Sequence, residues 1–313
     1  MAARAAESPM RELAALLARN LPAAVMLSAV GVVFPPGILL SAATVALVTL
    51  SGGQTRGLIV LAGATGVGGA LGAVLGMDPG HAALLLLAGC TPAWILSDLL
   101  RRSGSLPVTV LVACGLAIVG VLVFYAIVPV PAEWWHTWFA ETWDKIAAAS
   151  DAVVDTATRN DWLGLLRYEI LTGGAASNGM FFALGAVFAG RSLQALLVNP
   201  GGFREEFHNL RLGRTAAMVS IVVLALGLFA GSELLANVSA VVWSLWVLKG
   251  IALAHGVVAA ASLPSGWLVM MYVGLVIFSG PAMALVSVVG LADEFADFRG
   301  RLARRQSASP TDE

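Results

Sequence analysis

Charged residues are scarce in this chain of 313 residues: Asp, Glu, Lys and Arg make up 12% of it, and 58% is hydrophobic. A soluble domain has roughly 25% charged residues, so this composition, with its long apolar runs, excludes an ordinary soluble protein. The net charge of −1 excludes nucleic acid as the main partner. The composition instead predicts an all-α, polytopic transmembrane bundle of about 8–10 helical segments, with the lipid bilayer as its surroundings.

Cysteine is almost absent. Cys90 and Cys114 both lie inside apolar runs, which excludes a disulfide framework and a CxxC metal pair. The chain also lacks the HExxH, GxSxG and P-loop motifs of common enzyme classes. Its four histidines are scattered over different segments. We therefore expect no enzymatic activity, no cofactor and no metal site.

The most charged internal stretch is residues 199–214, NPGGFREEFHNLRLGR, which lies between two long apolar runs. A stretch of this kind must lie in water, and its excess of arginine indicates the cytoplasm. Phe203, Phe207 and Leu210 have helical spacing, so a short amphipathic helix is expected after the Asn-Pro-Gly-Gly turn. The loop either anchors the topology or serves as a docking surface for a cytoplasmic protein. The candidate contacts to lipid phosphates or to a partner are Arg191, Arg204, Arg211 and Arg214.

The chain reads as a single integral membrane domain. Its expected parts are a cytoplasmic amphipathic helix (1–21), N-terminal helices (22–130), a periplasmic Trp-rich amphipathic segment (131–171), C-terminal helices (172–293) that include the cytoplasmic loop 199–214, and a cytoplasmic tail (294–313). Trp134, Trp135 and Trp138 are typical of a membrane interface belt. A ligand-binding aromatic platform is the alternative.

Proline interrupts the apolar runs at both ends of the chain. Phe34-Pro35-Pro36 divides the first run into two short helices. The last run, 267–292, contains Gly280-Pro281 and precedes an arginine-rich tail. If this run were a single span, the tail would lie outside the cell, against the positive-inside bias. A split at Gly280-Pro281 is therefore expected, with both termini cytoplasmic. Nine full spans without the split is the alternative.

The residues after this run have helical spacing and predict a terminal surface helix. Its apolar face would contain Leu291, Phe295, Phe298 and Leu302. Asp297 and Arg301, four residues apart, would form an ion pair on it.

Lys249 is the strongest candidate for a functional residue. It lies near the middle of the run 234–263, roughly 20 Å from either end at 1.5 Å per residue. A lysine at that depth requires a polar cavity or a partner and is a functional hypothesis by default. We expect Lys249, Asn178 and His255 to form an intramembrane polar site. If the helix instead ends near His255, Lys249 lies at the interface. No acid is expected at its depth, and its candidate partners are Asp98, Glu233 and Asn178.

Three stretches carry a family resemblance: the opening LPAAVMLSAVGVVFPPGILL, the loop 199–214 and the closing GLADEFADFRGRL. Together they resemble the YybS-like family of bacterial integral membrane proteins, which is distantly similar to the substrate-binding components of energy-coupling-factor transporters. Those components capture small solutes and dock on a shared energising module through Ala-x-x-x-Ala motifs. Ala42 and Ala46, or Ala14 and Ala18, have that spacing.

The resemblance implies a bacterial inner-membrane protein that binds or moves a small solute, with a cytoplasmic or membrane energising partner. The alternative is a membrane scaffold that does not transport and that recruits cytoplasmic proteins through residues 199–214 and the arginine-rich tail. The sequence leaves the solute and the oligomeric state open.

Overall fold

The computed structural model describes residues 2–34, 36–149 and 156–301, and every regular element in this part of the chain is a helix. In chain order the elements are α1 (Ala2–Arg19), α2 (Leu21–Val30), η1 (Gly31–Val33), α3 (Gly37–Gly52), α4 (Gln54–Val74), α5 (Pro79–Ser103), α6 (Leu106–Ile127), α7 (Pro131–Ala149), α8 (Thr156–Gly164), η2 (Tyr168–Ile170), α9 (Leu171–Val198), α10 (Gly202–His208), α11 (Arg214–Phe229), α12 (Glu233–Ala260), α13 (Gly266–Ile277) and α14 (Ser279–Ala296). The expected all-α architecture is confirmed. The tail residues Leu302, Arg304 and Arg305 lie outside the described residues.

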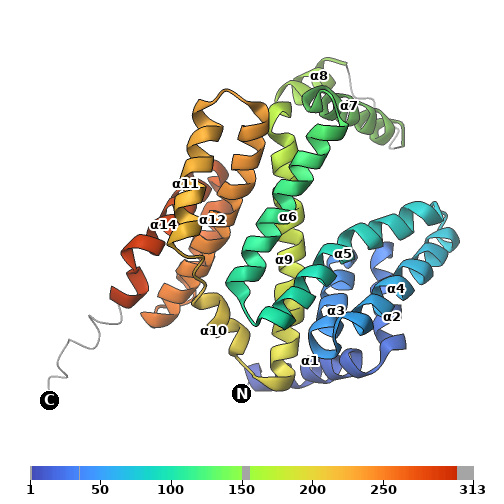
Figure 1. Ribbon diagram of the computed structural model, residues 1–313. Helices are drawn as coiled ribbons and strands as arrows, with labels where there is room; N and C mark the ends of the chain where they lie inside the picture. The colour runs from blue at the N-terminus through green and yellow to red at the C-terminus, as the bar shows by residue number, and fades with distance from the viewer. Residues whose placement is uncertain (1, 35, 150–155, 302–313) are drawn as a thin grey trace.

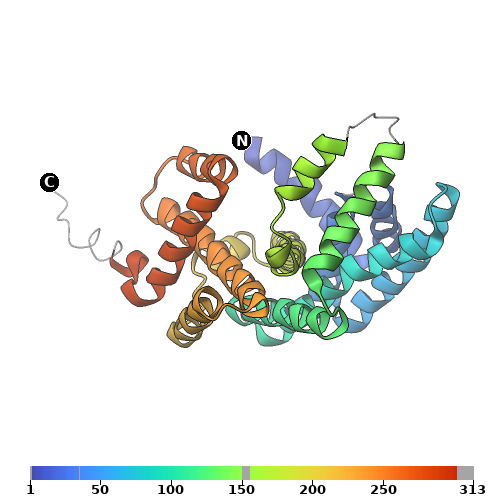
Figure 2. The same ribbon diagram turned by 90° about the horizontal axis from the view of Figure 1, so that it is seen from above.

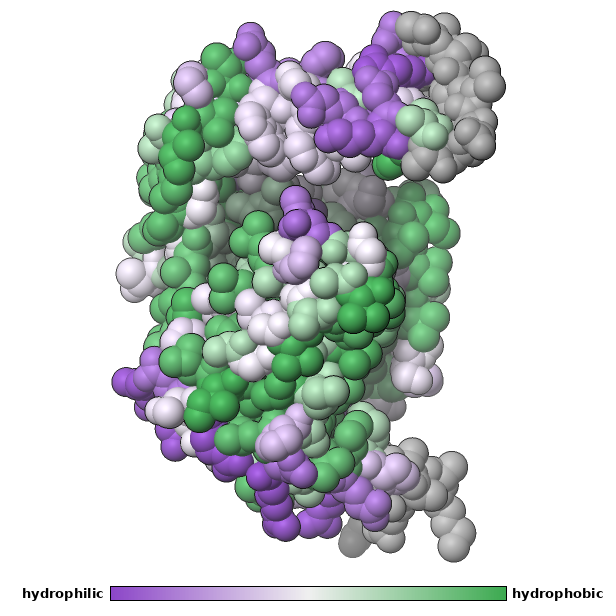
Figure 3. All heavy atoms as spheres, turned by 90° about the vertical axis from the view of Figure 1, so that its right-hand side faces the viewer, coloured by the Kyte–Doolittle hydropathy of each residue, from purple (hydrophilic) through white to green (hydrophobic). Residues whose placement is uncertain are grey.

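Five helices of the described chain are long and apolar enough to cross a membrane: α4, α5, α6, α12 and the combined η2–α9 segment. Three shorter helices, α3, α11 and α13, are also apolar. Figure 3 shows the same property on one face of the molecule, where an apolar belt lies between polar ends and is interrupted by one polar cluster. These features define a multi-pass helical membrane protein.

The two polar ends carry different parts of the chain (Figure 1). The N-terminus, α10 and the end of the described chain after α14 lie at one end, and α7 and α8 lie across the other. The segments expected on the same side of the membrane therefore do lie at the same end. The sequence predicts a tight turn at residues 77–81 on the far side of the membrane. The connection between α4 and α5 instead lies between the two ends, so this tilted hairpin does not reach the level of α7.

Both ends of the chain contain divided apolar runs. The first run is divided where expected, since η1 ends at Val33 and α3 begins at Gly37. The sharp bend of 109° lies earlier, between Pro9–Arg19 and Leu21–Val33. The last apolar run is divided at Phe278, two residues before the expected position. Pro281 lies in the first turn of α14, where the missing N–H of proline has no helical acceptor to lose. At 12 residues, α13 spans about 18 Å, too short for a hydrocarbon core of ~30 Å. It is therefore half a span.

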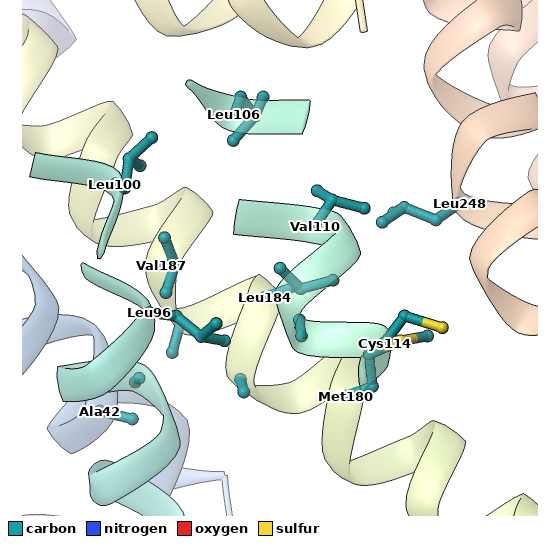
Figure 4. Close-up of a cluster of buried hydrophobic side chains, with 14 of the residues drawn as sticks. Ala42, Leu96, Leu100, Leu106, Val110, Cys114, Met180, Leu184, Val187 and Leu248 are labelled. Atoms are coloured by element: carbon teal, nitrogen blue, oxygen red, sulfur yellow. The ribbon is translucent and has the colours of Figure 1, made fainter. Parts of the chain in front are cut away.

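The core is built around α9, which is seen nearly end-on between the two halves of the molecule in Figure 2. Leu184 and Val187 of α9 pack with Leu96 of α5, Val110 of α6 and Leu248 of α12 (Figure 4). The short helix α3 is buried continuously from Ser41 to Leu50. Its Ala42 and Ala46, like Ala14 and Ala18 of α1, are buried inside the described chain. These alanines therefore stabilise the fold and present no docking surface.

The Trp-rich segment forms α7, whose tryptophan rings pack edge to face against one another and contact Phe124 at the end of α6. Trp135 lies 5.0 Å from Trp134 and 5.9 Å from Trp138 between ring centroids. Its indole N–H donates to the Thr172 hydroxyl at the start of α9, at 2.9 Å. This bond attaches α7 to the core. The sequence predicts a turn at Asn160-Asp161 after this helix, but α8 runs through both residues, so that prediction is wrong.

Candidate functional site

Lys249 lies in a buried cluster of charges. Its side chain is 0% exposed, and its Nζ donates to the Asp293 carboxylate at 2.7 Å and lies 3.6 Å from Glu294. Arg299 contacts the same Asp293 oxygen at 3.0 Å. The expectation that no acid shares the depth of Lys249 is therefore wrong. The division of the last run turns α14 back along α12, and Asp293, expected near the start of the tail, lies beside Lys249.

Two glycines allow α14 to approach α12 this closely. A Cβ on Gly250 would lie 2.0 Å from the Val286 carbonyl oxygen, and one on Gly290 would lie 2.6 Å from the Gly250 nitrogen. Backbone therefore meets backbone at the crossing, as at small-residue contacts between membrane helices. Gly250 directly follows Lys249, so the crossing and the ion pair belong to one contact.

Glu294 and Arg299 of the cluster also hold the connection between α10 and α11. Glu294 accepts hydrogen bonds from the backbone N–H groups of Leu212 and Gly213, at 2.9 and 3.0 Å. Arg299 donates to the carbonyl oxygens of His208 and Leu210. A buried backbone group needs such partners, so the charged cluster fixes the path of residues 208–213.

The end of the chain differs from the expected surface helix. α14 ends at Ala296, and Asp297 has a left-handed backbone with φ of 48°. The carboxylate of Asp297 pairs with Arg211 of the loop. The left-handed residue turns the chain back, so Arg299 is directed into the protein and is only 9% exposed. The prediction of one helix whose apolar face continues through Phe298 is therefore wrong. The tail begins later than residue 294, since α14 extends to Ala296.

Three of the four loop-side arginines have internal partners. Arg191 pairs with Glu206 and donates to Gln194 at 2.9 Å. Arg211 pairs with Asp297. The remaining two differ from each other: Arg214 donates to the Glu294 carbonyl at 3.4 Å, whereas Arg204 is exposed.

Arg204 lines a recess of about 470 Å³ between α10, α12 and α13. Among the described residues Arg204 has no ion-pair partner. The other polar residues of the recess are His208, His255, Ser262 and Ser265. We call this the cationic recess. The rings of His208 and His255 lie 6.0 Å apart, so two histidines and an arginine share a small volume.

The fold holds both histidines in place. His255 is hydrogen-bonded through Nε2 to the Tyr272 hydroxyl at 2.9 Å. A Cβ on Gly256 would lie 2.6 Å from the His208 carbonyl oxygen, so this glycine lets α10 approach α12. Burial, and then the positive charges nearby, of which Arg204 is the largest, lower the pKa of His208 below 6.5. The fold therefore holds both rings at the wall of the recess.

An apolar groove of about 550 Å³ adjoins the recess between α12, α13 and α14. Its walls include Leu253, Ala254, Met271, Leu285 and Val289. Three further residues line both spaces: Val258, Leu263 and Leu268. The recess and the groove are thus continuous.

The expected polar site of Lys249, Asn178 and His255 is not assembled. α12 continues to Ala260, so Lys249 lies about 17 Å from its end at 1.5 Å per residue. Asn178 is exposed on α9, and His255 lies in the recess, about 9 Å from Lys249 along the helix. The other suggested partners are also remote: Asp98 pairs with Arg102, and Glu233 begins α12.

The sequence analysis missed a second buried polar centre, at Asn237 of α12. Its amide nitrogen donates to the Tyr125 hydroxyl and to the carbonyls of Glu169 and Glu233, at 2.6–2.8 Å. Its amide oxygen accepts from the Gly173 N–H at 2.6 Å. Asn237 is fully buried and joins α6, α9 and α12. In the sequence, this polar centre is indicated by an asparagine within an apolar run.

Replacing Asn237 by leucine is expected to lower the thermal unfolding midpoint in detergent. The substitution leaves the buried Gly173 N–H without its acceptor, and one such group costs about 1–3 kcal/mol. Asn178→Leu on α9 is the matched control, since Asn178 is exposed and should tolerate leucine. Equal midpoints for the two variants would contradict the role of Asn237.

The lowered pKa of His208 predicts a pH-dependent stability. Below pH 6.5 the unfolded chain takes up a proton that the folded chain resists, so the free energy of unfolding falls as the pH falls. The charged groups around His208 are Arg204, His255 and Arg299. We expect His208→Gln to show a smaller decrease in unfolding midpoint between pH 7.5 and about 5.5 than the wild type. An unchanged decrease would show that His208 is not the group involved.

Among the described residues, no three His, Cys, Asp or Glu side chains are grouped so that they could hold a metal ion. Comparisons with models of protein families, with curated proteins and with solved structures gave no significant match.

Proposed function

We propose that this protein is a bacterial inner-membrane protein that binds a small anionic solute in the cationic recess. The observation that carries the proposal is the position of Arg204, an arginine without an ion-pair partner among the described residues, beside two histidines in a recess of about 470 Å³. Arginine and histidine are the usual donors to phosphate and carboxylate groups.

In this proposal the recess faces the cytoplasm. It lies at the end of the molecule that carries α10 and both termini of the described chain (Figure 1). Residues 199–214 contain three arginines and two glutamates, and an excess of arginine close to membrane spans favours the cytoplasmic side. The Trp-rich helix α7 then faces the periplasm.

A solute-binding role also agrees with the resemblance to the YybS-like family and, more distantly, to transporter substrate-binding components. An energising partner would then complete a transporter. The scaffold alternative is less favoured, because Arg191, Arg211 and Arg214 have internal partners. These contacts hold the loop in place, although Arg211 and Arg214 also lie at the surface.

The proposal is tested by the thermal stability of the purified protein in inorganic phosphate at constant ionic strength. A ligand that binds only the folded state raises the unfolding midpoint. We expect phosphate to raise it for the wild type and for Arg11→Gln, an exposed arginine of α1, but not for Arg204→Gln. An equal rise in all three proteins would overturn the proposal.

A further inference from the structure

The cationic recess and the apolar groove together have the form of a site for an amphiphile. Val258, Leu263 and Leu268 line both spaces, so one molecule can occupy both. The groove is lined almost entirely by apolar side chains. The recess adds two serines to its arginine and histidines.

The length of the combined site fits a lipid chain. It extends along α12 from Ala259 in the recess to Gly250 in the groove. Nine residues of helix cover about 14 Å, close to one leaflet, which is half of a ~30 Å hydrocarbon core. The charged groups lie at the end of the molecule and the apolar walls run inward from them, as the two parts of a membrane lipid do.

The charges of the recess favour an anionic headgroup. Arg204 is exposed and has no ion-pair partner among the described residues. Glu205 borders the adjoining surface with Asn209, but no acid lines the recess itself. A zwitterionic headgroup would bring its own cation toward Arg204 and would be disfavoured by repulsion.

We propose that this site binds an anionic phospholipid, with the phosphate in the cationic recess and one acyl chain in the apolar groove. The inference rests on the proposed function and names its solute class. Arg204 provides a charge-assisted hydrogen bond to the phosphate, with the serine hydroxyls and histidine rings beside it. The groove between α12, α13 and α14 then holds the chain away from the bulk bilayer.

The test is native mass spectrometry of the detergent-purified protein with dipalmitoyl phosphatidylglycerol or dipalmitoyl phosphatidylcholine. We expect the wild type to retain phosphatidylglycerol about tenfold more strongly, because both lipids offer a phosphate to Arg204 but only phosphatidylcholine brings a second cation beside it. Arg204→Gln should remove the preference. Ala254→Phe, which fills the groove, should reduce retention of phosphatidylglycerol and leave the phosphate-induced thermal shift intact.

Two further variants keep the test decisive. Val289→Phe fills the groove from α14, in case Ala254→Phe does not fold, and Ala175→Phe is the matched control at an exposed alanine of α9. Unchanged retention of phosphatidylglycerol in both groove variants would overturn the lipid inference and leave anion binding standing. Equal retention of the two lipids by the wild type would also overturn the lipid inference and leave anion binding standing. A phosphate shift insensitive to Arg204→Gln would overturn both proposals.

Discussion

Replacing Lys249 by methionine is expected to destabilise the protein by about 3–5 kcal/mol, the usual cost of removing one partner from a buried ion pair. Lys249 is 0% exposed and contacts Asp293 at 2.7 Å. The variant leaves the Asp293 and Glu294 carboxylates with one cation fewer in the interior. Because Arg299 still contacts Asp293, we expect the effect near the lower end of that range.

The double variant Lys249→Met with Asp293→Leu separates the ion pair from simple packing. Removing both charges avoids the uncompensated Asp293 carboxylate but also takes a partner from the buried Arg299. We therefore expect the double variant to regain part of the lost stability. The chain provides a matched control in its other lysine. Lys145 is exposed on α7 and lies 3.8 Å from Glu141, so Lys145→Met should change the stability by less than about 1 kcal/mol. Thermal unfolding in detergent measures all four proteins, and a Lys249→Met midpoint equal to that of the wild type would refute the assignment.

Replacing Gly250 by alanine is expected to have the second large effect. The added Cβ would lie 2.0 Å from the Val286 carbonyl oxygen, and a backbone atom cannot move away without separating α12 from α14. Overpacking of this kind costs about 1–3 kcal/mol, occasionally more. Separation of the helices would also lengthen the contact between Lys249 and Asp293, so the two effects should be coupled.

Gly115→Ala on α6 is the control for this substitution. A Cβ at Gly115 meets no atom within 4 Å, and alanine in a helix is more favourable than glycine by roughly 0.5–1 kcal/mol. We therefore expect Gly115→Ala to leave the unfolding midpoint unchanged or to raise it. If Gly250→Ala behaved in the same way, the close crossing of α12 and α14 would be refuted.

Most helices could be predicted from the sequence, because the cost of exposing polar backbone in hydrocarbon makes each long apolar run a helix. The division of the last run was also predictable from the arginines that follow it. The position of Asp293 beside Lys249, which follows from this division, was not predictable. The candidate partners of Lys249 were polar residues on other spans, whereas Asp293 was the last residue assigned to the C-terminal helices, next to the tail.

Side-chain partners depend on helix crossings that apolar runs do not encode. Gly250 and Gly290 are two of 34 glycines, and only the structure shows that these two meet. The cationic recess could be predicted only in part. Arg204 and His208 are four residues apart on a short amphipathic helix and so share a face, but nothing local relates them to His255.

The most direct test of the whole account is the sidedness of three single cysteines toward a membrane-impermeant maleimide in intact cells. The substitutions are Glu205→Cys in α10, Ser307→Cys in the tail and Lys145→Cys in α7; the native Cys90 and Cys114 are buried. The divided last run and the cytoplasmic recess predict labelling at position 145 and protection at positions 205 and 307. Labelling at 307 with protection at 205 would make the last run a single span and would contradict the return of α14 to Lys249.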